Sequence, residues 1–206
     1  MEGWNENKGK LAKLLYYSGC IKFGSFVLKS GITSPIYIDL DIAISFPVLL
    51  KTIAAEYISI LDELHFDKIV ALPYTGLPIG TAICLEKELP MLYPRKETIT
   101  YGTEASIEGI YYKDEKVVIV DDFVTSGNSV YDALDKINEV ELIVKDIVLL
   151  IDIESEGRDR LTGDGYNLHF IFKLKEMLGY WKSERLISVD TYLQVNAFLS
   201  NTVARH

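Results

Sequence analysis

The sequence predicts an α/β fold, a doubly wound parallel sheet with helices on both faces, and two observations support it. From residue 68 onward, short runs rich in Val and Ile alternate with stretches that repeat apolar residues at helical spacing. Turn residues separate the two kinds of segment, and strands that alternate with helices form parallel sheets. Residues 1–45 instead predict a helix and a small antiparallel hood, and residues 46–206 the core of the same single domain, 1–206.

Local patterns predict the elements of the N-terminal part. Leu11, Leu14 and Leu15 recur at helical spacing, and Gly19 can end that helix. Turn residues separate two short apolar runs, and Pro47 suits the first turn of a long amphipathic helix. The predicted elements are a helix, two strands and a helix: Trp4–Tyr17, Phe26–Leu28, Ile36–Leu40 and Pro47–Leu64.

Runs of β-branched residues and helical apolar periodicity predict the elements of the core. The predicted strands are Lys68–Leu72, Met91–Pro94, Lys116–Val120, Val144–Ile153 and Leu168–Phe172. The predicted helices are Pro78–Glu88, Val130–Val140 and Ser188–Leu199.

Composition narrows the class of protein. The chain has 206 residues, of which 49% are hydrophobic, enough for one full-sized core. A net charge of -9 argues against a nucleic-acid partner, because nucleic acids are bound by clustered Lys and Arg. The sequence has no apolar stretch of membrane-spanning length and no secretory signal, so we expect a cytoplasmic protein without a membrane partner. Cys20 and Cys84 are expected to be reduced thiols, and His65, His169 and His206 are too scattered to form a dedicated metal site.

The most informative segment is Val117–Val130, with the sequence VVIVDDFVTSGNSV. Asp121 and Asp122 stand at the carboxyl end of a predicted buried strand, where open α/β sheets bind ligands. Residues 125–129 can offer backbone N–H groups and hydroxyls to a phosphate at a helix N-terminus. The two carboxylates suit the 2- and 3-hydroxyls of a ribose, so the segment predicts a ribose 5-phosphate site. The structural alternative is a plain strand–turn–helix in which a hydroxyl caps the helix.

Two further loops follow predicted strands. Ala71–Gly76 precedes a helix and can form a second anion site, or it can be a turn that only packing requires. The long polar segment 95–109 has the composition of an active-site lid or of a disordered loop. Arg95 and Lys96 begin it and can reach a pyrophosphate, the alternative being two solvated charges.

These residues match a known family, because the chain resembles orotate phosphoribosyltransferases over nearly its whole length. Segment 117–130 is similar to the phosphoribosyl pyrophosphate (PRPP) motif of type I phosphoribosyltransferases. Segments 22–39 and 95–102 resemble the orotate enzymes in particular. The tripeptide Pro-Tyr-Thr at 73–75 is similar to the form fused to orotidylate decarboxylase in the UMP synthase of animals.

The resemblance implies a type I phosphoribosyltransferase fold, a homodimer, Mg²⁺ carried with PRPP, and transfer of a phosphoribosyl group to orotate. It implies catalytic roles for Asp121 and Asp122 at the ribose. The implied PRPP-binding residues are Lys29, Tyr74, Thr75, Arg95, Lys96, Tyr101, Asp121, Asp122, Phe123, Val124, Thr125, Ser126, Gly127, Asn128 and Ser129. The implied base-binding residues are Tyr37, Ile38, Thr125 and Ile153.

Three positions depart from the family pattern, and each loses a cation. The family has a catalytic lysine at Ile99, an arginine that pairs with the orotate carboxylate at Ile153, and in close relatives an arginine at Asp41. The lid also lacks Lys and Arg from residue 97 to 108. Loss of one transition-state cation lowers a rate by about a hundredfold or more, and a buried carboxylate left unpaired costs about 3–5 kcal/mol.

Four functions are compatible with these departures. The first is an orotate phosphoribosyltransferase, with reduced turnover. The second is a phosphoribosyltransferase for a base without a carboxylate, with Ile38 and Ile153 lining an apolar pocket. The third is a non-catalytic PRPP-binding regulatory subunit, and the fourth is a subunit whose site an intact paralogue completes. Fold alone does not choose among them.

Overall fold

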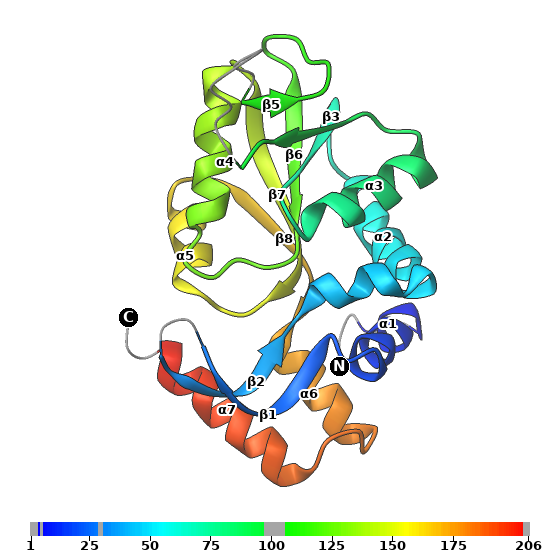
Figure 1. Ribbon diagram of the computed structural model, residues 1–206, viewed down its shortest axis with the longest axis vertical. Coiled ribbons are helices and arrows are strands. Elements are labelled where there is room, and N and C mark those ends of the chain that lie inside the picture. Colours follow the sequence, from blue (N-terminus) through cyan, green and yellow to red (C-terminus); the bar gives the residue numbers. More distant parts are fainter. Residues whose placement is uncertain (1–3, 5, 29–30, 97–105, 204–206) are drawn as a thin grey trace. The chain divides into compact units, whose positions relative to one another are not determined.

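The computed structural model describes residue 4 and residues 6–28, 31–96 and 106–203 (Figure 1). The chain divides into two compact units. The first comprises residues 1–52 and 172–206, and the second comprises residues 53–171. Helix α2 (Pro47–Leu61) begins in the first unit and continues into the second.

The first unit contains the predicted hood. Strands β1 and β2 pair antiparallel, as the sequence predicted, but β1 begins at Ile21 rather than at Phe26. The register shifts between Phe23 and Phe26, next to Gly24, and this irregularity interrupts the alternating pattern that would have shown the whole strand. The elements of this unit are α1 (Glu6–Tyr17), β1 (Ile21–Val27), β2 (Thr33–Ile38), the 3₁₀ helix η1 (Leu40–Ser45), α6 (Leu174–Ser183) and α7 (Val189–Val203).

Helix α6 is the main addition to the predicted elements, and it explains why residues 172–206 belong with the hood. Its Trp181 is fully buried, and the indole N–H donates a hydrogen bond to the carbonyl of Ala12 at 3.0 Å. The ring also meets Phe23 edge to face, with centroids 5.8 Å apart. The sequence does not separate α6 from the preceding strand β8 (Asn167–Lys173), because no turn residue stands between them.

The second unit is built on a six-stranded sheet with the order β5-β4-β3-β6-β7-β8. Strands β3, β4, β6 and β7 are parallel, and β5 pairs antiparallel with β4 at one edge. Figure 1 shows α3 and α4 on opposite faces of this sheet, so the predicted α/β class is confirmed. Its elements, together with the end of α2, are β3 (Lys68–Ala71), α3 (Gly76–Lys87), β4 (Met91–Pro94), β5 (Ile107–Glu108), β6 (Lys116–Asp121), α4 (Asn128–Glu139), β7 (Ile143–Asp152), α5 (Glu156–Gly163) and β8 (Asn167–Lys173).

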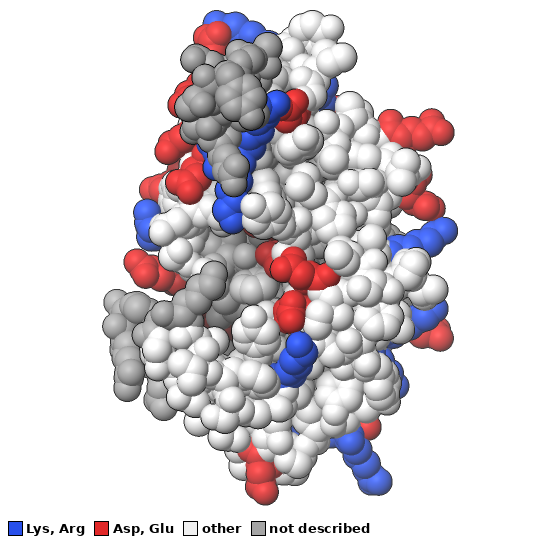
Figure 2. All heavy atoms as spheres, viewed as in Figure 1, with Lys and Arg blue, Asp and Glu red and all other residues white. Residues whose placement is uncertain are grey.

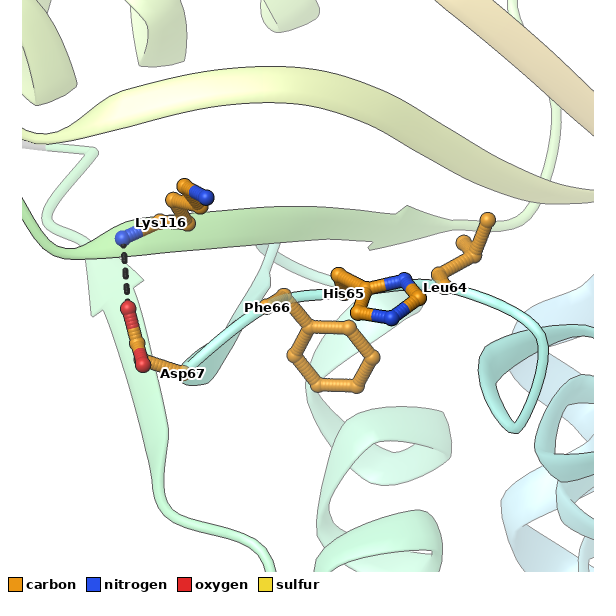
Figure 3. Close-up of a pocket in the computed structure, with 5 residues that line it drawn as sticks. All are labelled: Leu64, His65, Phe66, Asp67 and Lys116. Atoms are coloured by element: carbon orange, nitrogen blue, oxygen red, sulfur yellow. Dashed lines mark hydrogen bonds between the residues drawn. The ribbon is translucent and has the colours of Figure 1, made fainter.

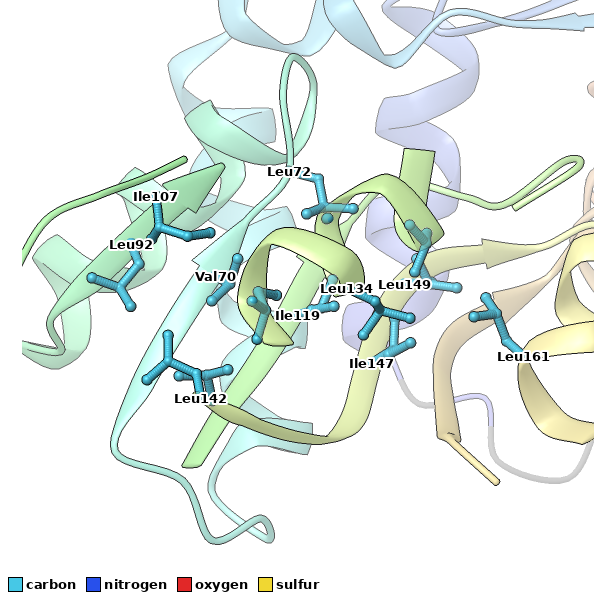
Figure 4. Close-up of a cluster of buried hydrophobic side chains, with 14 of the residues drawn as sticks. Val70, Leu72, Leu92, Ile107, Ile119, Leu134, Leu142, Ile147, Leu149 and Leu161 are labelled. Carbon is cyan, nitrogen blue, oxygen red and sulfur yellow. The ribbon is translucent and has the colours of Figure 1, made fainter. Parts of the chain in front are cut away.

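A cluster of aliphatic side chains on one face of the sheet forms the core of this unit (Figure 4). Val70, Ile119 and Leu149 come from three neighbouring strands, and Leu134 of α4 and Leu161 of α5 pack on them. These strands read as continuous apolar runs because both of their faces are covered. The sequence did not predict α5, whose only buried apolar side chain is Leu161.

The surface carries charge of both signs. On the face drawn in Figure 2, the Lys and Arg side chains of the described residues are interspersed with Asp and Glu side chains. In the part of the chain that the structure describes, none of the helices has the length and apolar character that crossing a membrane requires.

Helix α3 lies so close to the sheet that Gly80 has no room for a side chain. A Cβ added there would lie 2.6 Å from the Cβ of Ala71 and 3.0 Å from the sulfur of Met91, whereas a Cβ at Gly179 of α6 would meet nothing within 4 Å. We expect Gly80→Ala to lower the free energy of unfolding by about 1–3 kcal/mol through overpacking. Gly179→Ala is the matched control and should raise it by up to about 1 kcal/mol through helix propensity. Urea denaturation measures both, and a Gly80→Ala variant at least as stable as the parent would contradict the prediction.

Candidate functional site

The carboxyl ends of β3, β6 and β7 lie side by side, because β6 pairs in parallel with both of its neighbours. We name the connection after β3, residues 72–76, the Tyr74 loop, and residues 121–127, at the end of β6, the Asp-Asp loop. Both loops were predicted from sequence as ligand loops, and the sheet order places them next to each other. The connection after β7, residues 153–155, lies on the other side of the Asp-Asp loop.

Asp121 is the last residue of β6 and is buried, with 6% of its surface exposed. Its backbone carbonyl accepts a hydrogen bond from the buried hydroxyl of Tyr57 at 2.6 Å. Burial, and then the neighbouring negative charge of Asp122, raise the pKa of the Asp121 carboxyl well above its ordinary value. A hydroxyl donor or a cation beside these two adjacent acids would therefore favour the ionised form of Asp121.

The Tyr74 loop and the Asp-Asp loop are in close contact. A Cβ at Gly76, the first residue of α3, would lie 2.7 Å from the carbonyl oxygen of Val120 and 3.2 Å from Oδ1 of Asp121. Only glycine therefore lets the start of α3 come this close to the end of β6. Tyr74 itself is 63% exposed, so its ring is available to a ligand.

The Asp-Asp loop turns into α4 through Gly127, whose φ of 84° is a left-handed conformation that suits glycine. The carbonyl of Asp122 accepts hydrogen bonds from the N–H groups of Leu150 and Ile151, at 2.8 and 3.1 Å, which ties the loop to β7. Among the described residues, none accepts a hydrogen bond from the N–H groups of residues 125–127. These N–H groups stand at the N-terminus of α4, so they suit an anion.

The two predicted pyrophosphate cations have different surroundings. The guanidinium of Arg95 is paired with Glu108 on the neighbouring strand β5. Its backbone carbonyl accepts a hydrogen bond from Nζ of Lys136 at 2.5 Å. Nζ of Lys96 instead lies 4.4 Å from the centroid of the Tyr74 ring, a cation–π contact. The structure thus brings Lys96 to the Tyr74 loop and neutralises Arg95 within an ion pair.

The predicted base-binding residues fall in both units, which are described separately. In the first unit, Tyr37 is 41% exposed on β2 and stacks on Phe26, with centroids 5.5 Å apart. Ile38 ends the same strand, and Asp41 lies in η1. In the second unit, Ile153 directly follows β7 and is half-buried. Lys29, Ile99, Tyr101 and most of the predicted lid, residues 97–105, lie outside the described residues.

Helix α5 supplies contacts to the Asp-Asp loop that the sequence patterns did not predict. Ser155 caps this helix by accepting a hydrogen bond from the N–H of Arg158, and its hydroxyl donates to the carbonyl of Val124 at 2.6 Å. Arg158 in turn pairs with the buried carboxylate of Asp152 at 3.1 Å. A serine cap followed by acidic residues in the first turn is a helix signal that could have predicted α5.

A surface hollow of about 330 Å³ lies at the other end of the sheet (Figure 3). Asp67 and Lys116, which stand at the amino ends of β3 and β6, help to line this hollow. Its lining residues are Leu64, His65, Phe66, Asp67 and Lys116. None of the predicted site residues lines it, so it is separate from the candidate site.

Comparison with known proteins defines the class. The phosphoribosyl transferase domain family matches residues 47–164 of this chain. The uridine 5'-monophosphate synthase of Bos taurus is 38% identical over 200 residues, which are 93% of this chain and 42% of that protein. The structure of Leishmania donovani UMP synthase has a TM-score of 0.86 at 38% identity, over 94% of this chain and 42% of that chain. This chain therefore spans about two fifths of the length of those two proteins.

A shorter relative narrows the class to one family. The orotate phosphoribosyltransferase of Thermoplasma acidophilum is 33% identical over 174 residues, which are 84% of this chain and 99% of that protein. The chain belongs to the orotate phosphoribosyltransferase family, within the type I phosphoribosyltransferases. This confirms the resemblance that the sequence motifs indicated.

The raised pKa of Asp121 predicts that the site destabilises the protein in the absence of ligand. The unfolded chain has an ordinary Asp pKa of about 3.9. The folded state therefore holds this proton more strongly, and stability falls as the pH rises from that value through the raised folded pKa. Asp121→Asn should raise the melting temperature at neutral pH and flatten this part of the pH profile. Melting curves between about pH 4 and pH 8, with the exposed Asp135→Asn as control, test it, and an Asp121→Asn variant that melts lower at neutral pH would refute it.

Proposed function

We propose that this chain is an orotate phosphoribosyltransferase that binds PRPP and transfers its phosphoribosyl group to orotate in pyrimidine biosynthesis. Membership of the family supports the reaction class. The observation that carries the proposal is the Asp-Asp loop, where two adjacent carboxylates at the end of β6 precede N–H groups at the start of a helix. One segment thus suits both the hydroxyls and the phosphate of a ribose 5-phosphate.

The residues have distinct roles in this reaction. Asp121 and Asp122 accept hydrogen bonds from the ribose hydroxyls, and the N–H groups of residues 125–127 bind the 5-phosphate. The bond from ribose C1 to pyrophosphate breaks as N1 of orotate bonds to C1, and negative charge gathers on the pyrophosphate. The contact of Lys96 with the Tyr74 ring supports a role for this cation beside that charge.

The donor set fits Mg²⁺ that arrives with PRPP. Among the described residues, no group of three or more His, Cys, Asp or Glu side chains is gathered around a common point. Mg²⁺ is commonly bound by one or two carboxylates together with substrate phosphates, and Asp121 and Asp122 can supply the carboxylates. When bound, the ion would neutralise part of the charge on the pyrophosphate.

We also propose that the protein is a cytoplasmic homodimer. The resemblance to the family implies that the lid after Lys96 serves the site of a partner subunit. Two-fold homo-oligomers are also the commonest assemblies of soluble proteins. Cys20 and Cys84 are free thiols, as expected in a reducing compartment.

The surroundings of Ile153 favour a second candidate, a phosphoribosyltransferase for a base without a carboxylate. Ile153 is half-buried at the end of β7, where an apolar side chain suits an uncharged ring. The neighbouring cation, Arg158, is already paired with Asp152 and Asp159. The third and fourth functions, a PRPP-binding regulatory subunit and a subunit completed by a paralogue, retain the same PRPP site.

We predict that PRPP with Mg²⁺ stabilises the protein. A ligand at a hundred times its dissociation constant adds about 2.7 kcal/mol to the free energy of unfolding. For a chain of this size, that corresponds to a rise of roughly 5–11 °C in melting temperature. The double variant Asp121→Asn, Asp122→Asn should lose the shift, and Asp135→Asn should keep it. A parent protein that shows no shift at millimolar PRPP would exclude all four functions.

We predict that orotate turnover is low and can be raised by restoring cations. Ile99→Lys should raise kcat by about tenfold or more, because the lysine meets charge that develops in the transition state. Ile153→Arg should mainly lower KM for orotate, because the carboxylate is charged in the ground state too. Asp41→Arg belongs in the series because the resemblance implies an arginine at this position in close relatives.

Steady-state orotidylate synthesis by the parent and these variants is the measurement, and product formation with a panel of other bases is its control. Parent activity equal to that of a typical family member would show that another cation replaces the lysine. Failure of every variant to gain activity, with turnover of an uncharged base, would favour the second candidate.

A further inference from the structure

Helix α5 holds three consecutive carbonyl groups of the Asp-Asp loop. The hydroxyl of Ser155 donates to the carbonyl of Val124 at 2.6 Å. The N–H of Gly157 donates to the carbonyl of Thr125 at 2.9 Å. Nη1 of Arg160 donates to the carbonyl of Ser126 at 3.3 Å.

These bonds determine the direction of the loop N–H groups. In a trans peptide the C=O and the N–H point to opposite sides, and among the described residues the one cis peptide bond joins Pro73 to Tyr74. The carbonyls of residues 124–126 point toward α5, so the N–H groups of residues 125–127 point away from it. Three adjacent N–H groups on one side of a loop form a concavity that suits an anion.

Gly157 brings α5 into direct contact with the loop backbone. A Cβ at this position would lie 2.5 Å from the nitrogen of Gly127, 2.6 Å from the carbonyl carbon of Ser126 and 2.6 Å from the carbonyl oxygen of Thr125. All three are backbone atoms, so no side chain can turn aside to make room. The loop itself would have to move.

Arg160 is held in place by a second set of contacts. Its guanidinium lies 4.7 Å from the centroid of the Tyr131 ring of α4, and the hydroxyl of Tyr131 donates to Asp164 at 2.5 Å. The same ring lies beside Gly127, where a Cβ would come within 3.4 Å of it. Arg160, Tyr131 and Asp164 thus brace the end of the loop from the side opposite to its N–H groups.

We propose that α5 is the positioning element of the phosphate site, with Gly157 setting the path of the Asp-Asp loop and Arg160 bracing it from outside. The inference rests on the proposed function, because it assigns the loop N–H groups to the 5-phosphate of PRPP. These residues act through the loop and do not touch the ligand. The residues of α5 therefore control the affinity for the ribose 5-phosphate part of PRPP. Substitutions at Gly157 and Arg160 leave the affinity for pyrophosphate at the Tyr74 loop unaltered.

The test compares two glycines of the same helix. Gly157→Ala must displace the loop, whereas Gly163→Ala adds a Cβ that meets nothing within 4 Å. Calorimetric titration of the full chain with ribose 5-phosphate, with PRPP and Mg²⁺, and with pyrophosphate and Mg²⁺ gives three dissociation constants for each variant. Gly157→Ala should weaken ribose 5-phosphate and PRPP binding by about tenfold to a hundredfold, the effect of losing one or more charged hydrogen bonds. Its pyrophosphate affinity, and all three affinities of Gly163→Ala, should stay within about twofold of the parent.

Variants of Arg160, which lies at the surface, test the proposal if Gly157→Ala does not fold. Arg160→Ala should weaken ribose 5-phosphate binding by about threefold to tenfold, the effect of one modest hydrogen bond, and Arg160→Lys, which keeps a donor and a cation beside Tyr131, should recover most of it. If these residues had a purely structural role, their substitution would lower the melting temperature and would not change ribose 5-phosphate affinity more than pyrophosphate affinity.

The outcomes separate this inference from the proposed function. Ribose 5-phosphate affinity that is unchanged in folded Gly157→Ala, or in Arg160→Ala when Gly157→Ala does not fold, overturns the inference whatever the turnover. A parent that does not bind ribose 5-phosphate overturns it as well. A parent that binds PRPP, shows the expected variant effects and makes no orotidylate supports the inference while the proposed function fails.

Discussion

The pair of adjacent carboxyl groups at the end of β6, of which Asp121 is buried, is the interaction on which the rest of the site depends. Asp121 is 6% exposed and stands next to Asp122, so burial and the neighbouring negative charge raise the pKa of its carboxyl and make its ionisation unfavourable. Hydrogen bonds fix the backbone of both residues: the Tyr57 hydroxyl donates to the carbonyl of Asp121, and two N–H groups of β7 donate to the carbonyl of Asp122. A bound polyol, or a cation that arrives with it, relieves the unfavourable interaction between Asp121 and Asp122.

Two glycines allow helices to approach this pair from either side. Gly76 lets α3 start against the carbonyl of Val120, and Gly157 lets α5 start against the backbone of residues 125–127. A side chain at either position would separate a helix from the strand end that it supports. The ligand loops are therefore positioned by backbone packing, which holds N–H groups more firmly than mobile side chains could.

The cations of the site are few, and the structure shows how most of them are already engaged. Arg95 pairs with Glu108, and Arg158 pairs with Asp152 and Asp159, so neither guanidinium is free for a new anion. Lys96 has no such acid partner among the described residues and lies over Tyr74. In a chain with a net charge of -9, a phosphate ligand relies on backbone N–H groups, on placed cations such as Lys96 and on cations that come with it.

The sequence by itself determined the α/β class, the strand that carries Asp121 and Asp122, and the family, because buried strands and phosphate loops leave local patterns of composition and spacing. It could not reveal α5 as a support for the loop, because that helix buries little apolar surface and acts through hydrogen bonds to residues about 30 positions away in the sequence. It also could not tell that Arg95 is paired with Glu108, whereas Lys96 has no acid partner among the described residues. The two cations are adjacent in sequence, and the pairing of β4 with β5 brings Glu108 to Arg95. Local sequence patterns determine whether a segment is a helix or a strand. The order of strands in the sheet, and the positions where glycine allows backbones to touch, determine which side chains meet.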